Sequence, residues 1–149
     1  MRDKPFIFII FFLILSNCGY KPIYSTKNFN FSIGNVEKEN TSLNNKFARS
    51  INALTNRESE KKINIKIDSD KKIRTKSKDS KGNTLVLELE INLRFVNLDS
   101  DNQTQKVLSR KITYNNSDDK FKLKEYENEL EDILITKIIE DLINYLSNI

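Results

Sequence analysis

The fold is set by residues 85–96, which read LVLELEINLRFV. Apolar side chains occupy every second position from Leu85 to Phe95, and four of the six residues between and after them are polar or charged. Successive side chains of a strand point to opposite faces of a sheet, so this pattern predicts one long β-strand. One face of the strand is expected to lie on a core and the other largely in solvent, which is typical of an antiparallel sheet.

Shorter strands are predicted on either side of this one. Residues 63–73 alternate isoleucines with polar residues, although Ile73 follows less regularly, and a polar, basic turn then ends at residues 81–83. A fourth strand is expected over residues 107–114. Short polar turns join these three strands, which favours an antiparallel meander. A short first strand is predicted at residues 29–34.

Two amphipathic helices complete the pattern. The first is expected over residues 43–56, after the capping residues Thr41 and Ser42, with its stripe at Leu43, Phe47, Ile51 and Leu54. The second is expected over residues 123–148, after a start signal at residues 117–119. Its apolar stripe is Tyr126, Leu130, Ile133, Leu134, Ile138, Leu142, Tyr145 and Ile149, broadened by Ile135, Ile139, Ile143 and Leu146.

The predicted element order is β-α-β-β-β-α. It favours an α+β fold, a two-layer sandwich in which two helices cover one face of a four-stranded, mostly antiparallel sheet. The length of 149 residues allows one such domain with a targeting segment, and we assign the domain to residues 29–149.

The composition excludes several classes of site. The chain has no histidine, a single cysteine and three glycines that lie far apart. It therefore lacks the residues for histidine-dependent catalysis, an internal disulfide, a cysteine metal cluster or a glycine-rich phosphate loop. The acidic residues at 125–132 are expected on the solvent face of the second helix. We predict a protein that is not an enzyme and has neither cofactor nor metal; a small envelope hydrolase using serine, lysine or carboxylates is the alternative.

The N-terminus has the pattern of a lipoprotein signal peptide. A short basic stretch precedes ten apolar residues, Phe6–Leu15, which are too few to span a bilayer comfortably. Leu15 lies three residues before Cys18, as in the bacterial lipoprotein cleavage box. We expect residues 1–17 to be removed, Cys18 to be acylated, and residues 18–28 to form a lipidated tether; an uncleaved N-terminal anchor is the alternative. Gly19, in place of aspartate, favours the outer membrane.

Basic and acidic residues are separated along the chain. The basic segment, Lys71–Gly82, has six basic residues and one acidic residue, whereas residues 120–149 have four and seven. Such a segment attracts phosphate groups, although a solvated hairpin in a lysine-rich chain is an equally good interpretation. A chain that leaves the cytoplasm is not expected to bind nucleic acid, and a phosphorylated lipid is the better candidate.

The motif Cys18-Gly19-Tyr20-Lys21-Pro22-Ile23-Tyr24 resembles the start of the mature lipopolysaccharide (LPS)-assembly lipoproteins, many of which begin Cys-Gly-aromatic-x-Pro-(Leu/Ile)-Tyr. The matching positions are Cys18, Gly19, Tyr20, Pro22 and Tyr24. The resemblance implies the fold and element order predicted above. It also implies a lipoprotein, anchored in the inner leaflet of the outer membrane on the periplasmic side, that plugs the LPS-translocating β-barrel one to one and helps it to fold.

The same resemblance implies direct binding of LPS through basic loops at one end of the sheet. The corresponding candidates here are Lys71, Lys72, Arg74, Lys76, Lys78 and Lys81, with Lys120 and Lys122 as second choices. An accessory envelope lipoprotein of another transport complex, without an LPS role, is the alternative function.

Overall fold

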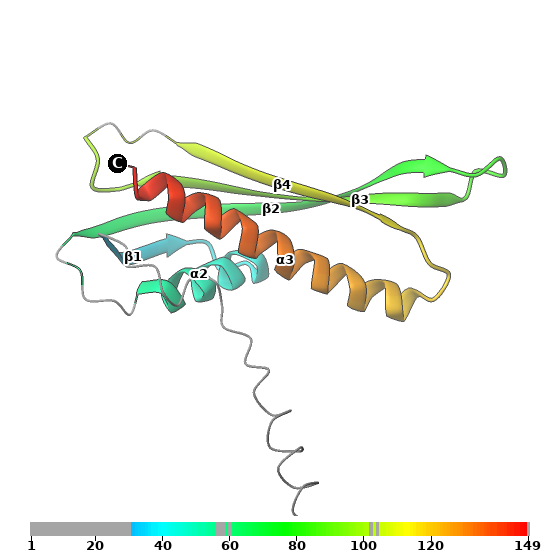
Figure 1. Cartoon of the computed structure of the whole chain (residues 1–149), viewed down its shortest axis with the longest axis horizontal. Coiled ribbons are helices and arrows are strands. Elements are labelled where there is room, and N and C mark those ends of the chain that lie inside the picture. The colour runs from blue at the N-terminus through cyan, green and yellow to red at the C-terminus, as the bar shows by residue number, and fades with distance from the viewer. Residues whose placement is uncertain (1–30, 56–58, 60, 102, 104, 149) are drawn as a thin grey trace, which may run out of the picture.

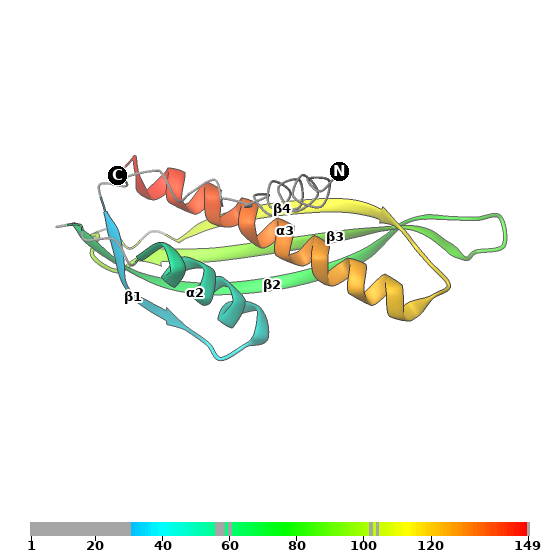
Figure 2. The ribbon, with the colours of Figure 1, turned by 60° about the horizontal axis from the view of Figure 1, so that its bottom comes forward.

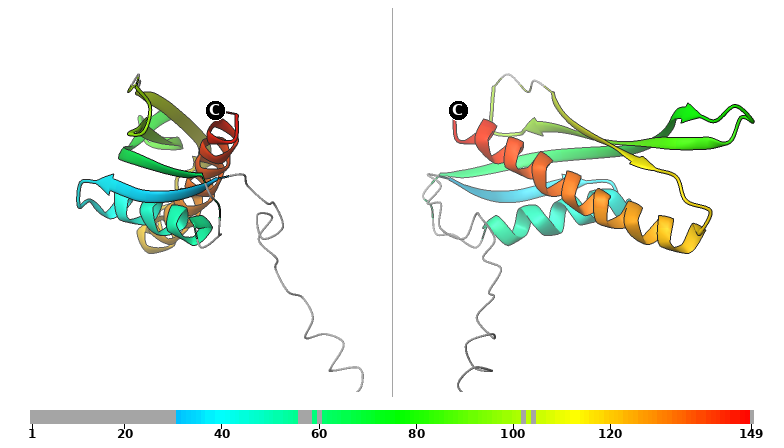
Figure 3. Two further views of the ribbon diagram at one scale, coloured as in Figure 1. Left: turned by 90° about the vertical axis from the view of Figure 1, so that its left-hand side faces the viewer. Right: turned by 45° about the vertical axis from the view of Figure 1, so that its right-hand side comes forward.

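The computed structural model describes residues 31–55, 59, 61–101, 103 and 105–148, which form two layers (Figure 1). A four-stranded sheet is covered on one face by two helices, and the end-on view separates the layers clearly (Figure 3). The elements are β1 (Ser32–Lys38), α2 (Ser42–Thr55), β2 (Lys62–Lys78), β3 (Thr84–Asn97), β4 (Lys106–Asn115) and α3 (Lys120–Leu146). This order and this architecture confirm the predicted α+β sandwich.

The sheet follows the chain in the order β1-β2-β3-β4. β1 and β2 are parallel, with α2 as the crossover between them, whereas β2, β3 and β4 form the predicted antiparallel meander. A parallel pair needs such a crossover, because a short turn cannot return the chain to the same end of the sheet.

The long alternating strand becomes β3, between β2 and β4. Its odd-numbered residues from Leu89 to Phe95 are buried against the helices, as the pattern predicts. Phe47 and Ile51 of α2 and Ile138 of α3 complete this core and are fully buried. Leu85, the first residue of the pattern, is instead half exposed at 50%, because it lies near the end of the strand.

Both helices begin where their capping residues predict. The Thr41 hydroxyl accepts the backbone N–H of Asn44 at 3.2 Å, and the Asp119 carboxylate accepts that of Lys122 at 3.1 Å. A side-chain acceptor at this position satisfies an amide that has no partner within the helix.

The predicted burial of α3 is partly wrong. Tyr126 and Ile133 were expected on the core stripe, but they are 47% and 46% exposed, while the acidic residues Glu127 and Glu131 are buried. The apolar stripe is wider than the side of the helix that the sheet covers, so its flank remains in solvent. Ile149, the last residue of the predicted stripe, lies outside the described residues.

Strand β2 is longer than predicted. Residues 74–78 were expected in a turn, but they continue β2 as far as Lys78, which lies opposite Thr84 of β3, with two register shifts after Thr75. The turn itself is residues 79–83, where Gly82 has a φ of 88°, a conformation that glycine adopts without strain. The β2–β3 hairpin therefore projects past the start of α3 (Figure 2).

Candidate functional site

The basic segment lies along the projecting part of the β2–β3 hairpin. Its even-numbered residues Lys72, Arg74 and Lys76 point to the face of the sheet that the helices leave open, and each is paired with a carboxylate. Lys72 lies 3.6 Å from Asp70, Arg74 lies 2.7 Å from Glu90, and Lys76 lies 3.2 Å from Glu88. These three cations are thus largely neutralised within the sheet.

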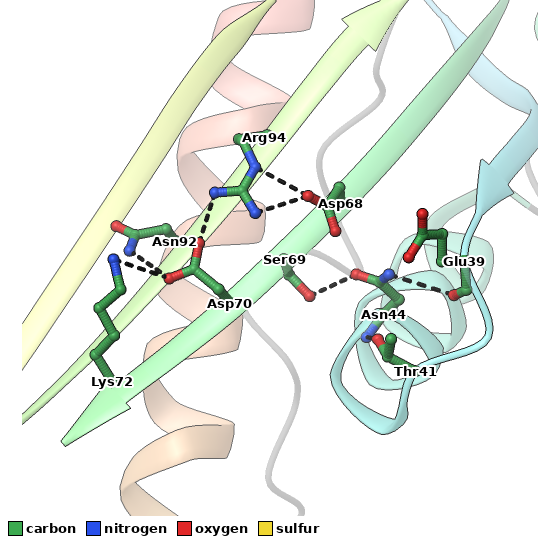
Figure 4. A network of polar contacts seen from close by, with 9 residues as sticks. All are labelled: Glu39, Thr41, Asn44, Asp68, Ser69, Asp70, Lys72, Asn92 and Arg94. Atoms are coloured by element: carbon green, nitrogen blue, oxygen red, sulfur yellow. Dashed lines mark hydrogen bonds and ion pairs between the residues drawn. The ribbon is translucent and has the colours of Figure 1, made fainter.

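A polar network continues these pairs along the open face (Figure 4). The Arg94 guanidinium bridges two acids of β2, at 2.6 Å from Asp68 and 2.6 Å from Asp70. A hydrogen bond from the Asn92 amide, together with Arg94, lowers the pKa of Asp70 despite its partial burial. Alternating charges across neighbouring strands stabilise the sheet, which gives this network a structural role.

Lys71 has a different position, on the helix-covered face. Its ammonium lies 2.5 Å from the carboxylate of Glu131 in α3, and the ammonium of Lys46 in α2 lies 2.7 Å from the same group. Burial alone would raise the pKa of Glu131, but the hydrogen bonds from Lys46 and Lys71 outweigh it and lower that pKa. This buried carboxylate links both helices to the sheet. Because Lys71 is paired with it, this predicted lipid-binding lysine already has a partner within the protein.

Glu131 should therefore control the stability of the protein in acid. A lowered pKa in the folded state means that its contribution is present above its ordinary pKa of 4.5 and is lost as the pH falls below that value. We expect Glu131→Ala to reduce the free energy of unfolding at neutral pH by about 2 kcal/mol, because it leaves Lys71 without its carboxylate partner and Lys46 with only the exposed Asp132. Urea unfolding from neutral to acid pH measures this loss.

The matched control is Glu129→Ala, on the exposed face of the same helix. It should change stability by less than about 0.5 kcal/mol. Equal stability of the two variants at neutral pH would contradict the role of Glu131.

Lys78 and Lys81, at the hairpin turn, have no carboxylate partner among the described residues. The one acid nearby, Asp79, is engaged by the turn itself, since its carboxylate accepts the backbone N–H groups of Lys81 and Asn83, each at 2.8 Å. Hydrogen bonds from the Asn83 side chain and backbone lower the pKa of Asp79 and keep it ionised. These hydrogen bonds hold the turn together, while the exposed side chains of Lys78 and Lys81 remain available to a ligand.

The structure brings Lys120 close to this turn. An open hollow is lined by Asp79, Asn83, Thr84 and Leu85 of the hairpin and by Asn116, Asp118 and Lys120. The Lys120 ammonium donates to the carbonyl of Ser117 at 3.0 Å and to the side chain of Asn116 at 3.5 Å. Lys122, the other second choice, lies 3.7 Å from Asp119 in an exposed ion pair. Three of the eight candidates, Lys78, Lys81 and Lys120, therefore combine exposure with the lack of a carboxylate partner in the described part of the chain.

Apolar side chains lie exposed at the same end of the molecule, which we call the distal end (residues 78–85 and 116–126). They are Leu85, half exposed, Phe121, which is 73% exposed, and Tyr126. The Tyr126 ring packs edge-on against Tyr114, whose hydroxyl donates to Glu127 at 2.6 Å, and burial together with this bond raises the pKa of Tyr114. No sequence pattern pointed to Phe121, because an isolated aromatic residue at a helix start has no periodicity.

The described residues offer neither a metal site nor a membrane-spanning helix. They contain no group of three or more acidic, cysteine or histidine residues placed to hold a metal ion. None of the helices seen is both long and apolar enough to cross a membrane. Cys18 and the rest of its motif lie outside the described residues, so its acylation stays a prediction.

Comparison with known proteins identifies the fold. No protein-family model matches the chain, and no curated protein matches it in sequence. Rare lipoprotein B from Shewanella oneidensis is similar in structure, with a TM-score of 0.56 and 12% identity, over 79% of this chain and 96% of that one. A minor lipoprotein from Acinetobacter baumannii gives a TM-score of 0.57 and 11% identity, over 81% and 92% of the two chains.

A third structure extends the agreement to a larger share of the chain. The solution structure of lipoprotein B from Nitrosomonas europaea covers 87% of this chain and 90% of its own, with a TM-score of 0.55 and 16% identity. This chain has the fold of these lipoproteins. At such identities the likeness concerns the lipoprotein fold alone, and the roles of individual residues must be argued from their own contacts.

Proposed function

We propose that this chain is a non-enzymatic lipoprotein of the outer membrane, anchored on the periplasmic side through acyl chains on Cys18. It plugs the lumen of a β-barrel that moves LPS to the outer leaflet, binds that barrel one to one and helps it to fold. The lipoprotein fold supports this proposal, as does the motif that begins at Cys18.

The proposal that this chain binds LPS rests on the side chains found at the distal end. Lys78, Lys81 and Lys120 have no carboxylate partner among the described residues, and they lie at the same end of the molecule as the exposed side chains of Leu85 and Phe121. LPS presents phosphate groups next to acyl chains, and an ammonium forms its strongest hydrogen bonds with such anions. The distal end therefore matches both halves of that ligand, whereas the neutralised lysines of the open face do not.

The proposed mechanism has three parts. The acyl chains on Cys18 hold the domain at the inner leaflet, where attachment through several chains is stable. The two-layer domain fills the barrel. The distal end contacts the phosphates and acyl chains of LPS and loosens its aggregates.

The test is affinity capture of the intact lipoprotein, tagged at its C-terminus, from solubilised membranes, followed by mass spectrometry. We expect one large outer-membrane barrel in equimolar amount, together with LPS. An unrelated lipoprotein with the same tag is the control and should capture neither. Recovery of the protein alone, or with inner-membrane transporter subunits, would contradict the proposal and favour an accessory role in another complex.

A further inference from the structure

Strand β4 leaves a regular backbone edge open. It is the last strand of the sheet, and its ten residues pair with β3 without any register shift, from Lys106 opposite Phe95 to Asn115 opposite Val86 (Figure 2). No strand pairs with its other side in the described part of the chain. In an antiparallel strand, alternate residues direct their N–H and C=O groups outward, so this edge presents a row of unpaired donors and acceptors.

The other two open edges are less suited to pairing. β1 has an irregular register between Ile33 and Val36. The part of β2 that β1 leaves uncovered pairs regularly with β3 from Asp68 to Thr75, but it has two register shifts between Thr75 and Lys78. Such irregularities bend a strand and interrupt its row of hydrogen-bonding groups, which protects an edge. Among the described strands, β4 offers the longest regular open edge.

The hydrophobic core extends to β4, but β4 leaves part of its apolar surface exposed to solvent. Leu108 and Ile112 point toward the helices and pack on the core, yet both remain partly exposed. On the open face, Val107 is 58% exposed. An added strand would cover these side chains if it carried apolar residues at alternate positions, since cross-strand neighbours pack in pairs.

Charge determines which kind of strand fits. Residues 106–115 contain Lys106, Arg110 and Lys111 and no acidic residue. Arg110 is held by Asp141 of α3 through two bonds of 2.7 Å, and Lys106 lies over the Tyr145 ring, which leaves its charge uncompensated. Lys111 lies opposite Glu90 of β3, but the Glu90 carboxylate is held by Arg74 at 2.7 Å, and no carboxylate of the described residues lies within ion-pair distance of Lys111. An acidic strand would therefore be attracted.

A second copy of this chain is disfavoured by the same charges. In either central antiparallel register of two β4 strands, Arg110 or Lys111 would lie directly opposite itself, with no acidic residue in the strand to compensate. Like charges directly opposite each other destabilise a sheet. The same charges therefore favour an occupant from a different protein over a second β4 strand.

We propose that β4 binds one extended, acidic segment of the partner barrel, which adds as a fifth strand to the sheet. This inference rests on the proposed function for the identity of the partner. The segment carries apolar residues on the side that meets Leu108 and Ile112, and carboxylates near Lys106 and Lys111. Main-chain hydrogen bonds along the edge supply affinity, and these two sets of side chains supply specificity.

Site-specific photocrosslinking in cells tests the proposal. A photoreactive residue at Val107 or at Thr113, both on the β4 edge, should give crosslinks to one acidic stretch of the barrel. The same residue at Thr75, on the irregular edge of β2, is the control and should not reach that stretch. Crosslinks to a second copy of this chain, or none from β4 while the barrel is still captured, would overturn the inference and leave the proposed function intact.

A charge variant gives an independent measurement. Lys106→Gln with Lys111→Gln should reduce the amount of captured barrel about tenfold, because complementary charges control association. The matched control, Lys66→Gln with Lys137→Gln, changes two exposed lysines elsewhere and should capture barrel normally. Unchanged capture by the first variant would overturn the inference, whereas absence of the barrel with the wild-type protein would overturn both proposals.

Discussion

Charge reversal of Lys78 and Lys81 is expected to weaken LPS binding at least about tenfold, because each lysine would lose a charge-assisted contact with phosphate. Both positions are exposed and lack a carboxylate partner in the described structure, and neither side chain takes part in the bonds by which Asp79 holds the turn. Lys78→Glu with Lys81→Glu should therefore bind LPS poorly and remain folded. Fluorescence anisotropy with labelled LPS, and urea unfolding of the same variant, measure the two properties.

The control variant has the same change in net charge, but its two substitutions lie away from the distal end. Lys66→Glu with Lys137→Glu replaces two exposed lysines, one in β2 opposite Glu37 of β1 and one in the middle of α3. Its affinity for LPS should stay close to that of the wild-type protein at physiological salt, where screening limits distant charges. Equal losses in the two variants would show that net charge, and not the distal end, governs binding.

Phe95→Ala should produce the largest loss of stability, about 4 kcal/mol of the free energy of unfolding. Phe95 is 1% exposed in the central strand β3, and its ring packs edge-on against Tyr145 of α3 with 5.4 Å between centroids. Truncation removes this contact and leaves a cavity between the two layers. The total free energy of unfolding of a native protein is about 5–15 kcal/mol, so a loss of this size should lower the urea midpoint sharply.

Val96→Ala provides the comparison for Phe95, since it lies next to it in β3 but points to the open face and is only half buried. We expect this substitution to cost about 1 kcal/mol or less. A Phe95→Ala protein that unfolds at nearly the wild-type urea concentration would contradict the assigned core.

The elements that were predicted well are those whose signal lies in their own stretch of sequence. One face of β3 packs on the core, so the burial of its residues appears in the sequence as an alternation of apolar and polar side chains. Thr41 and Asp119 mark the starts of the helices because their side chains can accept a backbone N–H. The projecting part of β2 has no such signal, because its residues are exposed on both faces. It is a strand because β3 pairs with it, and pairs such as Arg74 with Glu90 become visible only in the assembled sheet.

The same distinction applies to the candidate site. The basic segment was evident from composition, but the sequence does not show that Lys71 is bound by Glu131, sixty residues later. Nor does it show that Glu131 is buried, because alternating acids on an amphipathic helix are typical of a solvent face. The juxtaposition of Lys120 with the hairpin turn likewise depends on the β4–α3 connection and not on any local motif.

The parallel pairing of β1 with β2 has a consequence for the order of folding. The meander of β2, β3 and β4 consists of neighbours joined by short connections, and such local contacts form early. β1 can join only after α2 has formed and packed, because its partner lies beyond that helix in the chain. The strand that is synthesised first is therefore expected to be the last to dock, so the domain is completed at its N-terminal edge.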